Sequence, residues 1–125
     1  MIVHRFMSSL EYQRLMRGDQ LRNFDTHIAC ATDSIGFCFF VEDPFDAIHW
    51  LSGIVDCDYC VTMDIPDKML IKSFATYLNP STEGRMRKKE YCLTNYCKDD
   101  VRIVKVYSEE FRKYSYLTRL MRYFI

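Results

Sequence analysis

The sequence predicts a single α+β domain, residues 1–125, in which two small, mainly antiparallel sheets form a cleft and three helices flank them. The length of 125 residues suits one compact domain and is too short for two ordinary ones. A hydrophobic fraction of 49% and an aromatic fraction of 15% supply ample bulk for a core. Short β-branched and aromatic runs are interspersed with capped amphipathic segments, which is typical of mixed α and β structure.

A strand and a capped helix are predicted at the start of the chain. Residues 2–7 begin with β-branched side chains and continue to an aromatic one, as strands often do. Ser8 and Glu11 form a capping box, in which the serine hydroxyl and the glutamate carboxylate satisfy two end amides of the helix. Gly18 is placed to end this helix as a left-handed cap.

The middle of the chain predicts a buried central strand followed by a second helix. Residues 20–24 suggest a short strand, and residues 26–34, which are small and polar, a loop. Residues 36–41 form a continuous apolar run of strand length, so we expect a buried central strand. Asp43 then caps a helix that has Pro44 at its first position.

The second half predicts three strands, a loop and a last helix. Residues 59–65 alternate between apolar and polar side chains, which indicates a half-buried strand. Residues 79–90 are polar, basic and rich in turn formers, and we interpret them as the longest mobile loop. Strands follow at residues 91–96 and 101–107, and Ser108 caps the last helix. The segment between the strand at 59–65 and the loop is assigned no element.

The core is predicted from the apolar positions of these elements, and several of the six cysteines are expected to join it. The spacings Cys57-x2-Cys60 and Cys92-x4-Cys97 also permit a zinc site or, at the first pair, a redox couple. Neither pair has a glycine-containing knuckle and Cys60 begins a predicted strand, so we expect no metal. We also expect no disulfide, because cysteines of a cytoplasmic protein are reduced. Five other side chains are expected to be buried: Phe37, Phe39, Leu51, Val61 and Ile103.

No segment of the sequence is predicted to enter a membrane. The longest uncharged stretch is residues 73–82, followed by residues 47–55 and 34–41, whereas a spanning helix needs about 20 apolar residues. His4 and Arg5 lie where the apolar core of a secretory signal would run. We therefore expect a cytoplasmic protein whose cysteines are reduced thiols.

Charge is balanced over the whole chain but not along it. Seventeen Lys and Arg match seventeen Asp and Glu, which argues against electrostatic binding of nucleic acid by the chain as a whole. Residues 1–80 hold six bases and eleven acids, whereas residues 81–125 hold eleven bases and six acids. The two halves either neutralise one another across the fold or make a two-signed surface that steers a partner.

Several short motifs follow one another in an order that resembles a known family. The first strand carries His4 and Arg5, the central strand begins Gly-Phe-x-Phe at residues 36–39, residues 47–50 read Ala-Ile-His-Trp, and Glu90 directly precedes a strand. This order resembles the small ADP-ribosyltransferase-like domains of bacterial or phage type. Their central signature is Gly-Phe-aromatic-x-Ser/Thr, then an acidic residue and a helix with an Ala-x-x-Trp/Tyr pattern.

The resemblance implies NAD as cofactor, bound in the cleft between the sheets, and mono-ADP-ribosyl transfer to a protein or a nucleic acid. Arg5, or alternatively His4, would hold the phosphate or ribose of NAD. Glu90 would accept a hydrogen bond from the nicotinamide ribose and stabilise the positive charge that develops at its anomeric carbon. Arg5 and Glu90 are then expected to point into the same cleft.

The chain departs from the family pattern in the central strand. Phe40 and Val41 stand where a serine or threonine is usual, so the polar contact with NAD is assigned to Thr32 and Ser34, just upstream. Phe37 completes the predicted cofactor contacts. Because of this departure, a domain that has lost the activity and kept a binding role also fits the sequence.

A non-enzymatic alternative rests on the acidic segment 33–67. Between Arg22 and Lys68 there is no lysine or arginine, and the clustered carboxylates could imitate nucleic-acid phosphates and occupy a basic groove. The protein would then be an inhibitor or interaction protein, as phages and mobile elements encode. The carboxylates expected to contact the partner protein are Asp43, Asp46, Asp56 and Asp58.

Overall fold

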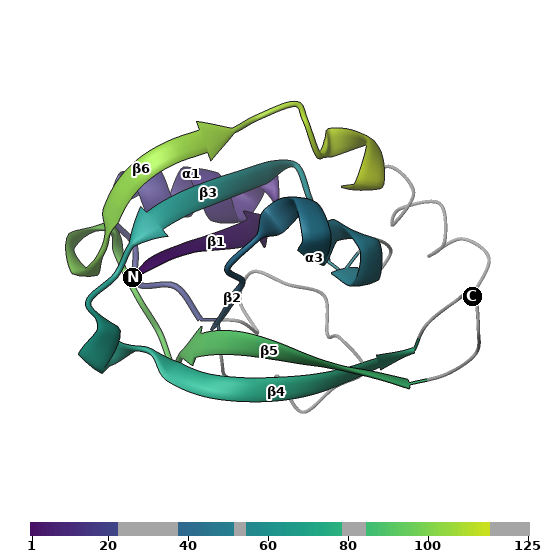
Figure 1. Ribbon diagram of the computed structural model, residues 1–125. Coiled ribbons are helices and arrows are strands. Elements are labelled where there is room, and N and C mark those ends of the chain that lie inside the picture. Colours follow the sequence, from purple (N-terminus) through teal and green to yellow (C-terminus); the bar gives the residue numbers. More distant parts are fainter. Residues whose placement is uncertain (23–37, 52–54, 79–84, 116–125) are drawn as a thin grey trace.

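Two three-stranded antiparallel sheets organise the part of the chain that the computed structural model describes, residues 1–22, 38–51, 55–78 and 85–115 (Figure 1). The first sheet has the order β1-β3-β6 and the second the order β2-β5-β4. The strands of the first sheet are β1 (Ile2–Met7), β3 (Tyr59–Asp64) and β6 (Arg102–Tyr107). Those of the second are β2 (Cys38–Phe40), β4 (Ile71–Leu78) and β5 (Arg85–Leu93).

The two sheets meet where β1 passes the end of β2. The backbone N–H of His4 donates to the carbonyl of Val41 at 2.8 Å, and the N–H of Val41 donates back to His4 at 2.8 Å. Pairing therefore continues from one sheet to the other, and β2 lies between β1 and β5. The predicted α+β architecture with two small antiparallel sheets is confirmed.

Two helices pack on opposite faces of the first sheet, α1 (Ser9–Arg17) behind it and α3 (Pro44–Leu51) in front of it in Figure 1. The serine half of the predicted capping box is present, but the Glu11 carboxylate binds Arg5 instead, and the predicted caps at Gly18 and Asp43 are present. The Ser8 hydroxyl accepts from the N–H of Glu11 at 3.1 Å, and Gly18 ends α1 with a φ of 91°. Asp43 caps α3, since its Oδ1 accepts from the N–H of Phe45 at 3.0 Å.

The apolar side chains form two clusters because successive residues of a strand face opposite ways. Val3 and Met7 of β1 pack in the larger cluster with Leu15 of α1. Phe6 has the opposite parity, so it faces the other way and packs in the smaller cluster with Ala47 and other residues of α3. The strand parity of β1 thus decides which core each of its residues enters.

Residues 85–90 correct the sequence prediction, because they belong to strand β5 and not to a loop. Their partner is β4, which follows a 3-10 turn at Asp67–Met69. The sequence predicts no element for this stretch between the strand at 59–65 and the loop. Four of residues 85–89 are charged, so the sequence shows no alternation of apolar and polar side chains there that would predict a strand. Only the pairing with β4, which depends on a distant segment, makes it extended.

Other elements agree with the prediction in part. Leu51 and Val61 are buried as expected, but Phe39 and Ile103 are only half-buried, and the buried neighbour of Phe39 is Phe40. The helical residues 112–115 lie within the predicted last helix. Several predicted features lie outside the described residues: the whole loop at 26–34, the last two residues of the strand at 20–24, the first residues of the central strand with Phe37, and the end of the last helix.

Candidate functional site

His4 of β1 and Glu90 of β5 lie on the same face of the two strands that flank β2. His4 pairs directly with Val41, and β2 pairs with β5 so that Phe40 lies opposite Tyr91. Continuing this antiparallel register by one residue sets Glu90 beside Val41. Residues paired directly across antiparallel strands point to the same side of a sheet, and strands are spaced about 4.8 Å apart. The Cα atoms of His4 and Glu90 are therefore about 10 Å apart, with Val41 between them.

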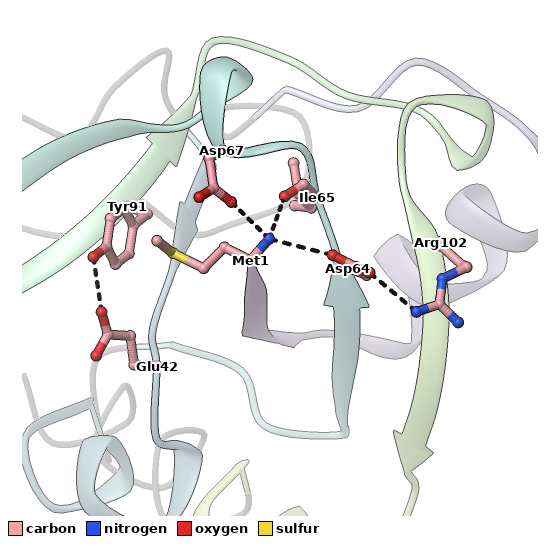
Figure 2. A network of polar contacts seen from close by, with 7 residues as sticks. All are labelled: Met1, Glu42, Asp64, Ile65, Asp67, Tyr91 and Arg102. Atoms are coloured by element: carbon pink, nitrogen blue, oxygen red, sulfur yellow. Dashed lines mark hydrogen bonds and ion pairs between the residues drawn. The ribbon is translucent and has the colours of Figure 1, made fainter.

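The residues on either side of Glu90 confirm which way its side chain points. The Tyr91 hydroxyl donates to Glu42 Oε1 at 2.7 Å (Figure 2), and the Lys89 ammonium lies 2.9 Å from the same oxygen. Lys89 and Tyr91 are thus held on one side of β5, so Glu90 faces the other. Cys92, two residues on, shares the face of Glu90: burial raises the pKa of its thiol, and the Glu90 charge adds to this.

The Glu90 carboxyl is buried, with 2% of its surface exposed. A carboxylate in such a place interacts with nearby charge through a low effective dielectric constant, so it stabilises a developing cation more strongly than an exposed one would. Lys88 also lies on this face, and its ammonium sits 4.5 Å from the centroid of the Trp50 ring of α3.

His4 is half-buried and held in place by its neighbour in β3. Its Nδ1 lies 2.8 Å from the Thr62 hydroxyl, in a hydrogen bond that fixes the ring. Burial lowers the pKa of His4, although the carboxylate of Asp43 and the backbone of Glu42 act in the opposite direction. The imidazole is therefore neutral at pH 7, which suits a hydrogen bond to a sugar hydroxyl and not the binding of phosphate by charge.

Arg5 does not share the site with Glu90, and this corrects the sequence prediction. Its Nε and Nη2 donate to Glu11 Oε1 at 3.1 and 2.8 Å, and its Nη1 donates to the carbonyl of Phe39 at 3.0 Å. Arg5 has the parity of Val3, so it faces the larger core while His4 and Glu90 face away from it.

The ion pair between Arg5 and Glu11 is sealed from solvent, since 2% and 0% of the two side chains are exposed. Burial acts to lower the pKa of Arg5, but the opposing effect of the Glu11 carboxylate is larger. The pKa of Arg5 is therefore raised above its ordinary value. The guanidinium is thus always charged, and its charge is neutralised by Glu11 inside the core. The sequence assigned Glu11 to a capping box, and its contact with Arg5 was missed.

The acidic residues of the alternative hypothesis fall into two groups. Asp43 and Asp46 are exposed at the start of α3. Asp56 and Asp58 are buried, and the Asp58 Oδ2 accepts from the backbone N–H of Ser9 at 3.1 Å and from its hydroxyl at 3.3 Å. Half of the proposed contact surface is therefore part of the fold, because Asp58 holds the start of α1.

A further polar network, which the sequence did not suggest, lies at the other end of β1 and β3 (Figure 2). The amino-terminal ammonium of Met1 donates to the Ile65 carbonyl at 2.8 Å and contacts Asp67 at 2.8 Å and Asp64 at 3.3 Å. Arg102 of β6 completes it with a contact to Asp64 at 3.0 Å. These bonds tie the three strands of the first sheet together at that end.

No group of three or more potential metal ligands occurs among the residues that the structure describes. Five of the cysteines are described, all as free thiols: Cys38, Cys57, Cys60, Cys92 and Cys97. Burial raises the pKa of Cys57, and that of Cys60 to about 12, so neither is a reactive thiolate at neutral pH. Three predicted cofactor contacts, Thr32, Ser34 and Phe37, lie outside the described residues.

The described helices include none that is long and apolar enough to cross a membrane. The resemblance to ADP-ribosyltransferase-like domains rests on the sequence motifs. Comparison with known proteins adds no relative: no family model, no curated protein and no solved structure matches this chain.

Proposed function

We propose that this protein is an NAD-dependent mono-ADP-ribosyltransferase-like protein that binds NAD on the face shared by His4 and Glu90. The observation that carries the proposal is the strand order, which brings the first strand, the central strand and the strand of Glu90 side by side. A histidine and a buried carboxylate from residues 86 positions apart in the sequence (90 minus 4) thereby face the same space.

Glu90 is the proposed catalytic residue. In the transfer, the bond between C1 of the ribose and the nicotinamide nitrogen breaks, and nicotinamide leaves with the bonding electrons. The positive charge that remains on the ribose is stabilised by a fixed carboxylate, most effectively where water is excluded. The acceptor, a protein or nucleic-acid nucleophile, then forms the new bond to C1 and gives up its proton.

His4 replaces Arg5 as the cofactor contact from the first strand. Its neutral ring, held by Thr62, is suited to a ribose hydroxyl of NAD. Arg5 is not available for phosphate, because releasing it would leave Glu11 buried without its cation. Thr32, Ser34 and Phe37 remain the proposed contacts for the other parts of the cofactor, and the cytoplasm remains the proposed location.

Ligand-induced stabilisation tests the binding step. NAD and ADP-ribose should each raise the melting temperature of the protein, since a ligand at a hundredfold excess over its dissociation constant stabilises by about 2.7 kcal/mol. His4→Asn should reduce this shift. His49→Asn, which changes an exposed histidine of α3, is the matched control and should not. Absence of a shift with both ligands would exclude the proposal.

Release of nicotinamide tests the chemical step. Glu90→Gln keeps the size of the side chain and removes its charge, so it should abolish nicotinamide release and transfer while the thermal shift with NAD persists. Glu109→Gln, at an exposed position, should retain full activity. If the wild-type protein binds NAD but never releases nicotinamide, it is a binding domain that has lost the activity.

A further inference from the structure

We propose that strand β6 pairs with β6 of a second copy of this chain, antiparallel and about a two-fold axis. This inference goes beyond the function proposed above and does not depend on NAD. β6 is the outermost strand of the first sheet, and its one partner among the described strands is β3 (Figure 1). No backbone group of residues 102–107 bonds to a described residue outside this sheet. The N–H and C=O groups along the outer edge of β6 are therefore available to a further strand.

The side chains of β6 also suit contact with another strand. Val104 is 48% exposed, although it is apolar. Ile103 and Val106 pack against the larger core but remain half-buried. A strand laid beside β6 would cover the exposed parts of these side chains, and β-branched residues are those that pack best between neighbouring strands.

A β-bulge in β6 decides which residues can pair across the two-fold axis. Thr62 of β3 pairs with Lys105, and the next residue, Met63, pairs with Ile103. Val104 is thus an extra residue without a direct partner in β3. Because side chains alternate along a strand, this extra residue reverses the alternation between the two halves of β6.

The reversal places residues from the two halves of β6 on the same face. Arg102 and Tyr107 pair with positions of β3 that are four residues apart, so they share one face although they are five positions apart in β6. Ile103 and Val106, three positions apart, share the other face, toward the larger core. The first half of one strand therefore matches the second half of another copy.

One register satisfies this match on both faces. Its direct pairs, each formed twice about the axis, are Arg102 with Tyr107, Ile103 with Val106, and Val104 with Lys105. The apolar pair lies on the face of the larger core, and no two cations are directly opposite each other. A shift by one residue would pair residues from opposite faces and would set Lys105 against Lys105, or Val104 against Val104, of the second copy. Lysine often protects an edge strand, but in the proposed register it meets no like charge.

The resulting dimer would join the two first sheets into one sheet of six strands, with equivalent faces on the same side. The contact is only one strand wide. We therefore expect a reversible dimer and not a permanent one, since permanent dimers bury much larger interfaces.

Sedimentation velocity of the full chain over a range of concentrations tests the proposal. The wild-type protein should shift from monomer to dimer as its concentration rises. Val104→Lys sets a lysine opposite Lys105 of the second copy at two symmetric positions, so it should raise the dissociation constant of the dimer at least about tenfold. Ile71→Lys makes the same change at a 52% exposed residue of the edge strand β4 and should leave that constant unchanged.

A charge exchange tests the register. Val104→Lys/Lys105→Glu sets a lysine opposite a glutamate of the second copy, so the dissociation constant should return to within about threefold of the wild-type value. In a register shifted by one residue, this variant would place lysine against lysine or glutamate against glutamate, and the dimer would stay weak.

Three results would overturn the proposal: a wild-type protein that is monomeric at every concentration, equal weakening by Val104→Lys and Ile71→Lys, or no recovery in the double variant. Circular dichroism checks that each variant is folded. Should Val104→Lys fail to fold, amide hydrogen exchange of the wild type decides instead: exchange in β6 must slow as the concentration rises, and exchange in β4 must not. His4→Asn should not change the dissociation constant, so this proposal and the proposed function can fail separately.

Discussion

His4 and Arg5 are neighbours in β1, but they lie in opposite environments. The Arg5 side is closed: the guanidinium is buried against Glu11 and the carbonyl of Phe39, within the larger core. The His4 side carries a neutral imidazole bound to Thr62 and, two strands away, the carboxyl of Glu90. On a strand, one step along the chain separates a polar group that holds the fold from the one that we propose as a ligand contact.

Removal of the Arg5 guanidinium is the strongest test of this contrast. Arg5→Met should lower the free energy of unfolding by about 3–5 kcal/mol, because it leaves the Glu11 carboxylate buried without its cation. The double change Arg5→Met/Glu11→Leu should recover most of the loss, since an apolar pair needs no compensating charge. Urea denaturation measures both.

Arg17→Met is the control for this prediction. Arg17 also binds a carboxylate, that of Asp19, but its side chain is 68% exposed, so its loss should barely move the urea midpoint. Equal stabilities of Arg5→Met and the wild type would show that the buried pair is not part of what holds the fold.

The central strand offers the same contrast between adjacent phenylalanines. Phe40 is fully buried and its ring meets Tyr96 edge-on at 5.5 Å, so Phe40→Ala should cost about 3–5 kcal/mol. Phe39 faces the other way and is half-buried, so Phe39→Ala should cost clearly less. Parallel urea titrations compare the two, and a larger loss at Phe39 would mean that the faces of β2 are reversed.

The elements set by local signals were predictable from the sequence. Ser8 and Gly18 mark the ends of α1, and Asp43 before Pro44 marks the start of α3, because capping depends on residues next to the helix ends. Strand β5 was not predictable in the same way. Its charged half from Arg85 gives no hydrophobic alternation, and its extended form depends on the distant β4.

The candidate site was predicted in its residue types but not in its geometry. The resemblance placed Glu90 at a strand, and a polar residue at position 4 or 5 in the first strand. Which of the two faces Glu90 depends on strand register, which a single sequence does not determine. The role of Glu11 was not predictable for a similar reason. Its contact with Arg5 joins α1 to β1, whereas a capping motif involves only residues at the end of its own helix.

The pH dependence of stability tests the His4 side. Burial lowers the pKa of His4 below its ordinary value of 6.5, so the unfolded chain binds a proton more readily than the native protein does. The stability that comes from a neutral His4 is therefore fully present above about pH 6.5 and is lost as the pH falls through the lower native pKa.

Urea midpoints at about pH 7.5 and about pH 5.5 measure this effect. The wild-type protein should lose more stability between the two values than His4→Asn, which cannot take up the proton. His49→Asn should behave like the wild type. If wild type and His4→Asn lost stability in parallel, the buried, neutral imidazole would be refuted.

The smallest effects are expected at two tyrosine hydroxyls, those of Tyr91 and Tyr96. The Tyr91 hydroxyl donates to Glu42 at 2.7 Å, so Tyr91→Phe should cost about 0.5–1.5 kcal/mol. The Tyr96 hydroxyl is buried beside the Arg5 guanidinium but makes no hydrogen bond of good geometry among the described residues, so the fold already bears its desolvation. Tyr96→Phe removes that cost and should leave stability unchanged or raise it by up to about 1 kcal/mol. Thermal denaturation of the two variants compares them, and a clear loss at Tyr96 would reveal that its hydroxyl takes part in the closed network around Arg5 and Glu11.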